Sequence, residues 1–285
     1  MLACGSRTLD LSQPCVMGIL NTTPDSFSDG GLYQSPSAAL LAVEVMVRDG
    51  AAIIDVGGES TRPGAEPVSV EQELDRVIPV IESISRNIDV LISVDTSSPL
   101  VMREAFCAGA GLINDVRALT REGALQAAQE TRLPVCLMHM QGKPETMQNA
   151  PVYHDAVEEV SGFLSDRVKA CVQAGIKQDQ LLLDPGIGFG KSLTDNLCLL
   201  KNLEEIVSHG LPVVLGASRK SMIGAVLNRS VSERLYGGLS VASLAVSSGA
   251  KIIRAHDVGA TVDAVKMAFA ITHATKTSIT KGRLF

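Results

Sequence analysis

Residues 181–191, LLLDPGIGFGK, contain the pattern that decides the fold of this chain. The three leucines form a short apolar run, which is typical of a strand buried on both faces of a parallel sheet. Asp184 stands at the end of that run, and a glycine-rich segment follows it. This segment fits neither of the phosphate-binding patterns G-x-x-x-x-G-K-[ST] and G-x-G-x-x-G, and Asp-Pro-Gly alone is an ordinary turn sequence. A single copy of this pattern therefore predicts little, and it is the repetition of the pattern along the chain that predicts the fold.

The same pattern recurs along the whole chain. Strands are expected at residues 15–20, 52–56, 90–94, 111–113, 134–138, 181–183, 212–215 and 251–253. Amphipathic stretches with helical spacing lie at residues 37–49, 70–87, 99–108, 123–131, 155–175, 193–208, 232–248 and 260–275. Such alternation predicts parallel β/α units, and eight of them predict an α/β fold with a single (β/α)8 TIM barrel.

The ends of the chain receive separate predictions. One domain is expected over residues 1–275, because no change in composition marks a boundary. Residues 9–13, before the first strand, are expected to form a short hairpin that closes the barrel floor. Residues 276–285 are polar and are expected to form a loosely held tail.

Composition excludes several classes of protein. The 285 residues are 46% hydrophobic, which is too apolar for disorder, and the net charge of -6 gives no general attraction to nucleic acid or to anionic lipid. The absence of Trp argues against a base-stacking surface. No apolar run approaches the roughly 20 residues that span a bilayer. The six scattered cysteines are typical of the reducing cytoplasm, where we expect this protein.

Each predicted strand is followed by polar residues, which a buried parallel strand does not need. The barrel topology brings these ends together into an active-site rim. Its acids and amides are Asp55, Asp95, Asn114 and Asp184, and its basic residues are Arg62, Arg219, Lys220, Arg254 and His256. Buried carboxylates need hydrogen-bond donors, and a basic cluster suits phosphate. The rim therefore predicts a nitrogen heterocycle that carries phosphate.

Two of these residues, and also His139, have plainer interpretations. Asp55 is expected to orient a neighbour rather than to bind a ligand, and His139, after the fifth strand, to be structural. Lys220 either pairs with an acid or, as a lysine at a barrel mouth, forms a Schiff base.

The motifs MGILNTTPDSF at residues 17–27 and DVGGESTRPG at residues 55–64 resemble those of bacterial dihydropteroate synthases, a family of pterin-binding barrels. Further matching motifs follow in order at residues 93–96, 113–115, 138–142, 184–191, 218–221 and 254–257. The resemblance implies that 6-hydroxymethyl-7,8-dihydropterin pyrophosphate is joined to 4-aminobenzoate. Dihydropteroate and pyrophosphate are the products, and Mg²⁺ assists.

The resemblance also implies roles for individual residues. The pterin would be held by Asp95, Asn114, Asp184, Lys220 and Arg254, with Val116 and Met138 as apolar walls and Gly216 and Arg219 beside them. Asn21 would hold Mg²⁺ on the pyrophosphate, which Thr61, Arg62 and His256 would contact. The aminobenzoate would lie against Phe27, Pro63, Phe189 and Ser221. Catalysis would rest on Asp29, Asp95, Lys220 and Arg254, which stabilise charge in a largely dissociative reaction.

The family resemblance further implies a homodimer, formed through the helix at residues 232–248, and inhibition by sulfonamides. Three other functions stay open at this point. They are a methyltetrahydrofolate-binding methyltransferase of the same superfamily, a lyase that forms a Schiff base on Lys220, and a non-catalytic pterin-binding protein.

Overall fold

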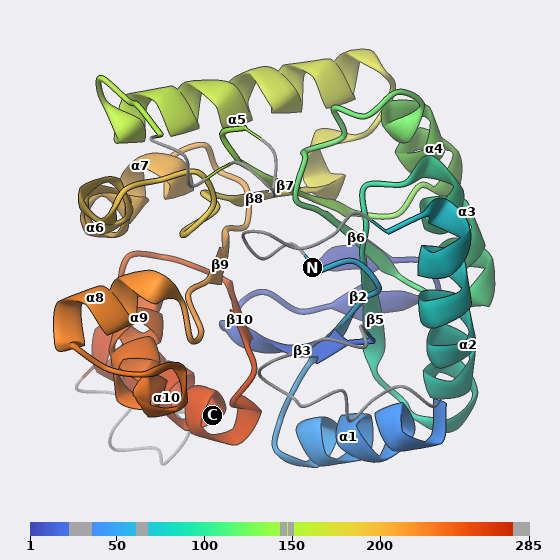
Figure 1. Ribbon diagram of the computed structural model, residues 1–285, viewed down its shortest axis with the longest axis horizontal. Coiled ribbons are helices and arrows are strands. Elements are labelled where there is room, and N and C mark those ends of the chain that lie inside the picture. Colours follow the sequence, from blue (N-terminus) through green and yellow to red (C-terminus); the bar gives the residue numbers. More distant parts are fainter. Residues whose placement is uncertain (23–35, 61–67, 143–146, 148–150, 276–285) are drawn as a thin grey trace.

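The computed structural model describes residues 1–22, 36–60, 68–142, 147 and 151–275 of the chain. In these parts a ring of helices surrounds the strands, which lie at the centre (Figure 1). The tail predicted at residues 276–285 lies outside the described residues.

Eight strands pair in parallel, in the order β8-β7-β6-β5-β4-β3-β10-β9. Their bounds are β3 (Cys15–Asn21), β4 (Ile53–Gly57), β5 (Leu91–Asp95), β6 (Leu112–Asp115), β7 (Val135–Met138), β8 (Leu181–Asp184), β9 (Val214–Gly216) and β10 (Ile252–Ala255). The two ends of this order meet at an isolated parallel bridge between Leu183 and Val213. The sheet is thereby almost closed, and the prediction of a (β/α)8 barrel is confirmed.

The helices cover the outside of the sheet (Figure 1). They are α1 (Pro36–Arg48), α2 (Val70–Asn87), α3 (Pro99–Ala108), α4 (Ala124–Thr131), α5 (Ala156–Gln173), α6 (Leu193–Lys201), α7 (Leu203–Val207), α8 (Ser221–Leu227), α9 (Leu235–Ser247) and α10 (Val258–Thr272), with short 3-10 turns η1 (Gln178–Gln180) and η2 (Val231–Glu233). The prediction of a single helix over residues 193–208 was wrong, because two helices, α6 and α7, meet at Asn202. The Asn202 side chain donates to the Cys198 carbonyl at 2.8 Å.

Local residue chemistry explains where helices begin and end. Ser69 caps α2 in a reciprocal arrangement with Gln72, which satisfies two backbone N–H groups at the start of the helix. Gly109 ends α3 at a φ of 114°, and a Cβ at this position would come within 2.3 Å of the Ser85 hydroxyl. Both its conformation and its packing therefore require glycine.

An apolar floor fills one end of the barrel. The hairpin of β1 (Leu2–Cys4) and β2 (Arg7–Leu9) packs against inward-facing side chains such as Met17 and Leu112. A hairpin therefore closes the floor as predicted, but it lies earlier in the chain than residues 9–13. With this end filled by side chains, a ligand can reach the barrel interior only from the carboxyl ends of the strands.

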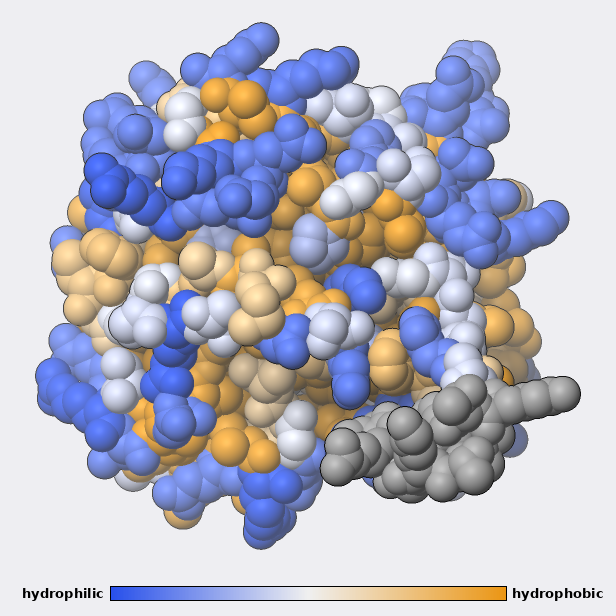
Figure 2. Space-filling model, turned by 180° about the vertical axis from the view of Figure 1, so that it is seen from behind, coloured by the Kyte–Doolittle hydropathy of each residue, from blue (hydrophilic) through white to orange (hydrophobic). Residues whose placement is uncertain are grey.

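The outer surface is mixed in character. On the face opposite to that of Figure 1, exposed hydrophobic residues lie between groups of hydrophilic ones (Figure 2). Among the described residues, no helix combines the length and the hydropathy needed to cross a bilayer.

Leu9 tests the role of the floor hairpin. Replacement by alanine is expected to lower the free energy of unfolding by about 2–3 kcal/mol, because this side chain is 8% exposed and packs in the floor. Urea denaturation measures the change. Leu41→Ala on α1 is the control, since Leu41 is 64% exposed and its loss should cost no more than about 0.5 kcal/mol. Equal effects of the two substitutions would contradict a packed floor.

Candidate active site

An arginine lies between two carboxylates just above the apolar floor. Arg254 on β10 donates from Nε to Asp55 Oδ2 at 2.6 Å and from Nη2 to Asp95 Oδ2 at 2.9 Å. Asn114 on β6 donates from Nδ2 to the same oxygen of Asp55 at 2.9 Å. We call these four residues the charged layer. It joins strands that are distant in sequence and places Asp55 in contact with Asn114 and Arg254, and the orienting role of Asp55 stays a prediction.

The charged layer is shielded from water. Asp55 is completely buried, and the side chain of Asp95 is 11% exposed. Burial and the charge of Asp55 raise the pKa of Asp95, although Arg254 opposes the shift. Burial also works against the charge of Arg254, but Asp55 and Asp95 outweigh it and raise the pKa of the guanidinium. Arg254 therefore stays charged, while Asp95 takes up a proton more readily than an exposed aspartate does.

Asp184 and Lys220 lie on the other side of the barrel mouth. Asp184, at the end of β8, accepts from the backbone N–H of Gly186 at 2.7 Å. Burial raises the pKa of Asp184, and the charge of Lys220 opposes this. Lys220 precedes α8, donates to the Ile187 carbonyl and lies 4.4 Å from the centre of the Phe189 ring. Burial lowers the pKa of Lys220 to about 8, so the side chain changes charge in a physiological range.

The glycine-rich segment, which we call the glycine loop (residues 185–190), is built from internal contacts. Gly186, Gly188 and Gly190 all have positive φ, and a Cβ on Gly186 would lie 1.9 Å from the His139 carbonyl oxygen. Three of its amides are engaged within the protein, since Gly186 donates to Asp184, Gly188 to Asn196 Oδ1 at 2.6 Å and Phe189 to the Gly186 carbonyl at 3.1 Å. These contacts give the loop a packing role.

His139 is structural, as expected. Its Nδ1 lies 2.9 Å from Nζ of Lys191, and the edge of its ring contacts Phe163 at 4.9 Å between ring centres. Burial and the nearby Lys191 lower the pKa of His139 to about 3, so the ring is neutral at physiological pH.

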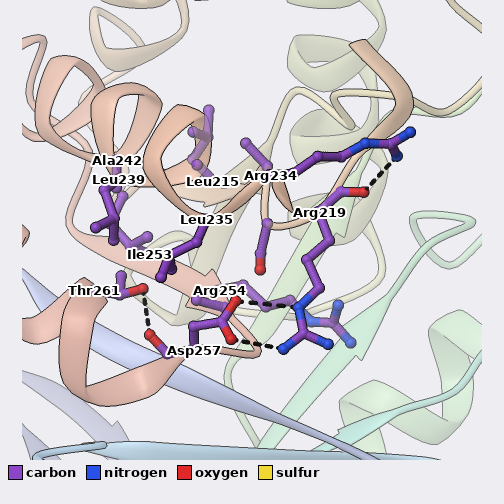
Figure 3. Close-up of a pocket in the computed structure, with 14 residues that line it drawn as sticks. Leu215, Arg219, Arg234, Leu235, Leu239, Ala242, Ile253, Arg254, Asp257 and Thr261 are labelled. Carbon is purple, nitrogen blue, oxygen red and sulfur yellow. Dashed lines mark hydrogen bonds and ion pairs between the residues drawn. The ribbon is translucent and has the colours of Figure 1, made fainter. Parts of the chain in front are cut away.

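Arg219 and His256 are held at the outer side of the mouth. Arg219 donates to both carboxylate oxygens of Asp257, at 2.6 and 3.1 Å, and its own carbonyl accepts from Arg234 at 3.0 Å (Figure 3). His256 Nδ1 lies 3.0 Å from the Ser218 hydroxyl. Behind them, apolar side chains of β9, β10 and α9 line a small recess of about 20 Å³. The ion pair with Asp257 was not anticipated, and it gives Arg219 a structural role in this structure.

The remaining candidates divide into two groups. Val116 and Met138 are both buried, Gly216 faces Arg254 across neighbouring strands, Asn21 ends β3, and Ser221 begins α8. The candidates Phe27, Asp29, Thr61, Arg62 and Pro63 lie outside the described residues. Their roles stay predictions, as do those of the first group.

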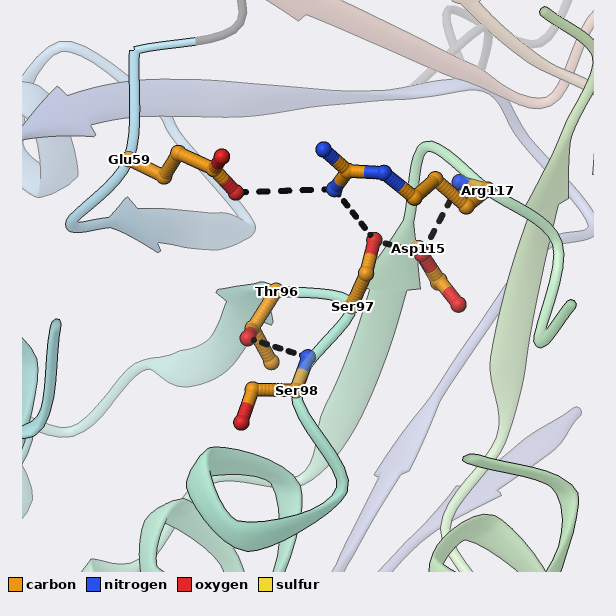
Figure 4. A network of polar contacts seen from close by, with 6 residues as sticks. All are labelled: Glu59, Thr96, Ser97, Ser98, Asp115 and Arg117. Atoms are coloured by element: carbon orange, nitrogen blue, oxygen red, sulfur yellow. Dashed lines mark hydrogen bonds and ion pairs between the residues drawn. The ribbon is translucent and has the colours of Figure 1, made fainter. Parts of the chain in front are cut away.

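A second polar network was missed in the sequence (Figure 4). Asp115 accepts from the backbone N–H groups of Arg117 at 2.9 Å and Leu119 at 2.7 Å, and from the Ser97 hydroxyl. Arg117 in turn donates to Ser97 at 3.1 Å and to Glu59 at 3.5 Å. Asp115 follows Asn114 in a strand, so their side chains must point to opposite faces. That alternation was the available signal that only one of them belongs to the barrel interior.

The family match and the similar proteins of known function all indicate one family. Residues 17–256 match the family described as Pterin binding enzyme. The dihydropteroate synthase of Escherichia coli K12 is 57% identical over 260 residues, which cover 91% of this chain and 92% of that protein.

Solved structures agree with this. A sulfonamide complex of the Yersinia pestis dihydropteroate synthase has a TM-score of 0.94 at 50% identity, covering 96% of this chain and 99% of that one. The Xanthomonas albilineans enzyme with 4-aminobenzoic acid has a TM-score of 0.90 at 48% identity, covering 95% and 98%. Its complex with 7,8-dihydropteroate has a TM-score of 0.87 at 45% identity, again covering 95% and 98%.

Asn114→Asp tests the charge balance of the charged layer. The substitution is nearly isosteric but places a third carboxylate beside Asp55 and Asp95, so we expect a loss of about 1–3 kcal/mol in unfolding free energy at pH 8. Burial and the neighbouring acids should raise the folded-state pKa of the new group. The loss should therefore be small near the pKa of an unfolded aspartate, about 4, and grow as the pH rises.

Urea denaturation at pH 5 and pH 8 measures this dependence. Gln178→Glu, at an exposed position in η1, is the matched control, because it also turns an amide into a carboxylate, and it should change stability by less than about 0.5 kcal/mol at either pH. A pH-independent effect at Asn114 would contradict the proposed charge balance.

Proposed function

The chain belongs to the pterin binding enzymes, in the dihydropteroate synthase family, and we propose that it joins 6-hydroxymethyl-7,8-dihydropterin pyrophosphate to 4-aminobenzoate. The products are 7,8-dihydropteroate and pyrophosphate. One observation carries this proposal: Asp55, Asp95, Asn114 and Arg254 form a buried charged layer at the mouth of a barrel whose floor is closed. A heterocycle rich in N–H groups suits such a site.

The pterin would bind in the mouth between the charged layer and Asp184. A carboxylate can accept about four hydrogen bonds, and Asp184 receives one from Gly186, so it can accept from the amino group and ring N–H of a pterin. Asn114 donates to Asp55 through Nδ2, which leaves its carbonyl oxygen as an acceptor directed by that contact. Asp95 and Lys220 would complete the ring of contacts around the pterin.

Arg254 would supply a fixed positive plane. Its Nε and Nη2 are occupied by Asp55 and Asp95, which hold the guanidinium in one orientation. A guanidinium plane can stack on an aromatic ring and also attract an anion. The carboxylates therefore prepare Arg254 for both tasks before substrate binds.

The family implies Mg²⁺, and the donor chemistry at the end of β3 fits this ion. Asn21 offers an amide oxygen at a partly buried position, opposite Gly57 on the neighbouring strand. Mg²⁺ commonly takes one or two protein oxygens and completes its shell with water and substrate phosphates. When bound, the ion would neutralise charge on the departing pyrophosphate. Thr61, Arg62 and His256 are the chain's own predicted contacts to that group.

The reaction would then proceed by loss of the leaving group. The bond from the pterin methylene carbon to the pyrophosphate oxygen breaks first, and both electrons leave with the pyrophosphate. The amine nitrogen of 4-aminobenzoate then bonds to the methylene cation and releases a proton. Asp29 and the carboxylates of the charged layer would stabilise the cation, and Phe27, Pro63, Phe189 and Ser221 would hold the amine.

Three further properties belong to the proposal. Inhibition by sulfonamides is supported by the Yersinia pestis relative, which was solved with a sulfonamide drug. A homodimer is supported by the exposed Tyr236, Leu244, Met267 and Ile271 on α9 and α10, an apolar group that a second copy could cover. Sedimentation velocity would test the dimer. A cytoplasmic location is supported by the six cysteines, all of which are free thiols.

The direct test mixes the purified protein with both substrates and Mg²⁺ and measures pyrophosphate and dihydropteroate together. The two products should appear in equal amounts, and removal of Mg²⁺ with a chelator should stop both. Asp184→Asn should reduce kcat/KM roughly 30- to 1,000-fold, because it removes a charged acceptor for the pterin. Tight pterin binding without pyrophosphate release would favour a non-catalytic binding protein instead.

Lys220 predicts how activity depends on pH. The kcat/KM for the pterin substrate, measured with saturating 4-aminobenzoate, should fall as the pH rises through about 8, because the ammonium loses its proton there. Lys220→Arg keeps its charge at all accessible pH values. This variant should be slower, by about tenfold, and should show no decline near pH 8. The same decline in both proteins would assign it to another group.

A further inference from the structure

A second lysine, Lys191, lies beneath the glycine loop and is not explained by substrate binding. Lys191 is only 2% exposed. Nζ lies 2.9 Å from His139 Nδ1 and donates to the carbonyl oxygens of Gly186 at 2.9 Å, Phe189 at 3.0 Å and His139 at 3.3 Å. A buried amine tolerates burial only where such acceptors surround it. These acceptors therefore compensate for the burial of the Lys191 amine and hold it in place.

These contacts join two elements. The Gly186 and Phe189 carbonyls belong to the glycine loop, whereas His139 follows the end of β7. The Lys191 amine therefore links two positions of the glycine loop, Gly186 and Phe189, to His139 at the end of β7. Tyr153 adds a separate tether, because its hydroxyl donates to the Gly190 carbonyl at 2.7 Å.

The opposite side of the same loop faces the substrate site. The Phe189 ring lies 4.4 Å from Lys220 Nζ, and the Ile187 carbonyl accepts from the same nitrogen. The position of the Phe189 ring therefore depends on how the loop is seated, whereas Lys220 is carried by the start of α8.

We propose that Lys191 is a positioning residue for the second substrate. Through the Gly186 and Phe189 carbonyls it seats the glycine loop, and thereby sets the Phe189 wall that faces the 4-aminobenzoate. This inference rests on the proposed function, because it assigns that substrate to the side of the mouth formed by Phe189.

The pterin contact on Asp184 should be far less sensitive to Lys191. Asp184 lies within β8, pairs with Met138 in the sheet, and its carbonyl accepts from the His139 N–H at 3.0 Å. The sheet therefore fixes Asp184 independently of the loop, whereas Phe189 lies beyond the end of β8 and relies on side-chain tethers. Loss of Lys191 should separate the binding of the two substrates.

Lys191→Met removes the amine while it keeps a similar length of side chain. The KM for 4-aminobenzoate should rise at least about tenfold, with kcat reduced less than about threefold. The Kd for dihydropterin pyrophosphate, measured by calorimetry without the amine, should change less than about twofold. A role confined to stability would lower the melting temperature without this selective change.

Ile81→Ala is the matched control, because Ile81 is fully buried on α2, away from the loop. It should reduce stability and leave the KM for 4-aminobenzoate at the wild-type value. An unchanged KM in Lys191→Met, or equal losses of both substrates, would overturn the inference. If Lys191→Met does not fold, Lys191→Gln decides, since its amide has two N–H donors for the carbonyls that the ammonium contacts and should raise the same KM about two- to threefold. An unchanged KM in Lys191→Gln would then overturn it.

Failure of the proposed function gives a different result. In that case the wild-type protein forms no dihydropteroate, whatever residue stands at position 191. The inference about Lys191 fails on its own when the wild type is active and its variants keep the wild-type ratio of amine KM to pterin Kd.

Discussion

The ion-pair arrangement of Arg254 with Asp55 and Asp95 is the constraint on which the rest of the barrel depends. A charge inside a barrel is tolerated only where opposite charges and hydrogen bonds surround it. Arg254 meets Asp55 at 2.6 Å and Asp95 at 2.9 Å, and Asn114 adds a donor to Asp55. Gly216 lies opposite Arg254 on the neighbouring strand β9. The floor below is apolar, so the charged layer separates a structural half of the barrel from a chemical half.

Two buried lysines, Lys191 and Lys220, contact the glycine loop from opposite sides. Lys220 contacts the face of the glycine loop that looks into the mouth, and Lys191 contacts the carbonyls beneath it. Burial lowers the pKa of each, to about 8 for Lys220 and about 7 for Lys191. Gly186 and Gly190 have positive φ and pack against backbone, so the loop between them has little freedom of its own. Its seating is decided by side chains outside residues 185–190, such as Lys191 and Tyr153.

The repetition of apolar runs with polar ends was enough to predict the barrel and to bring Asp95, Asn114, Asp184 and Arg254 to one mouth. Features that depend on non-local partners could not be predicted. The apolar spacing of residues 193–208 continues through Asn202, so the pattern held no sign of the break there. The network of Arg117 was equally hidden, because its partners lie in other strands' loops. The partners of Lys191 come from two separate loops and became evident only in three dimensions.

A double-mutant cycle of Asp55→Asn and Arg254→Met, with the free energy of unfolding measured by urea denaturation, tests the central claim most directly. Each single substitution leaves buried charge with less compensation, whereas the double variant removes both partners. The account predicts that the double variant loses less stability than the sum of the single losses, by about 2 kcal/mol or more. Losses that add to within about 0.5 kcal/mol would show that the two residues act independently and would contradict the account.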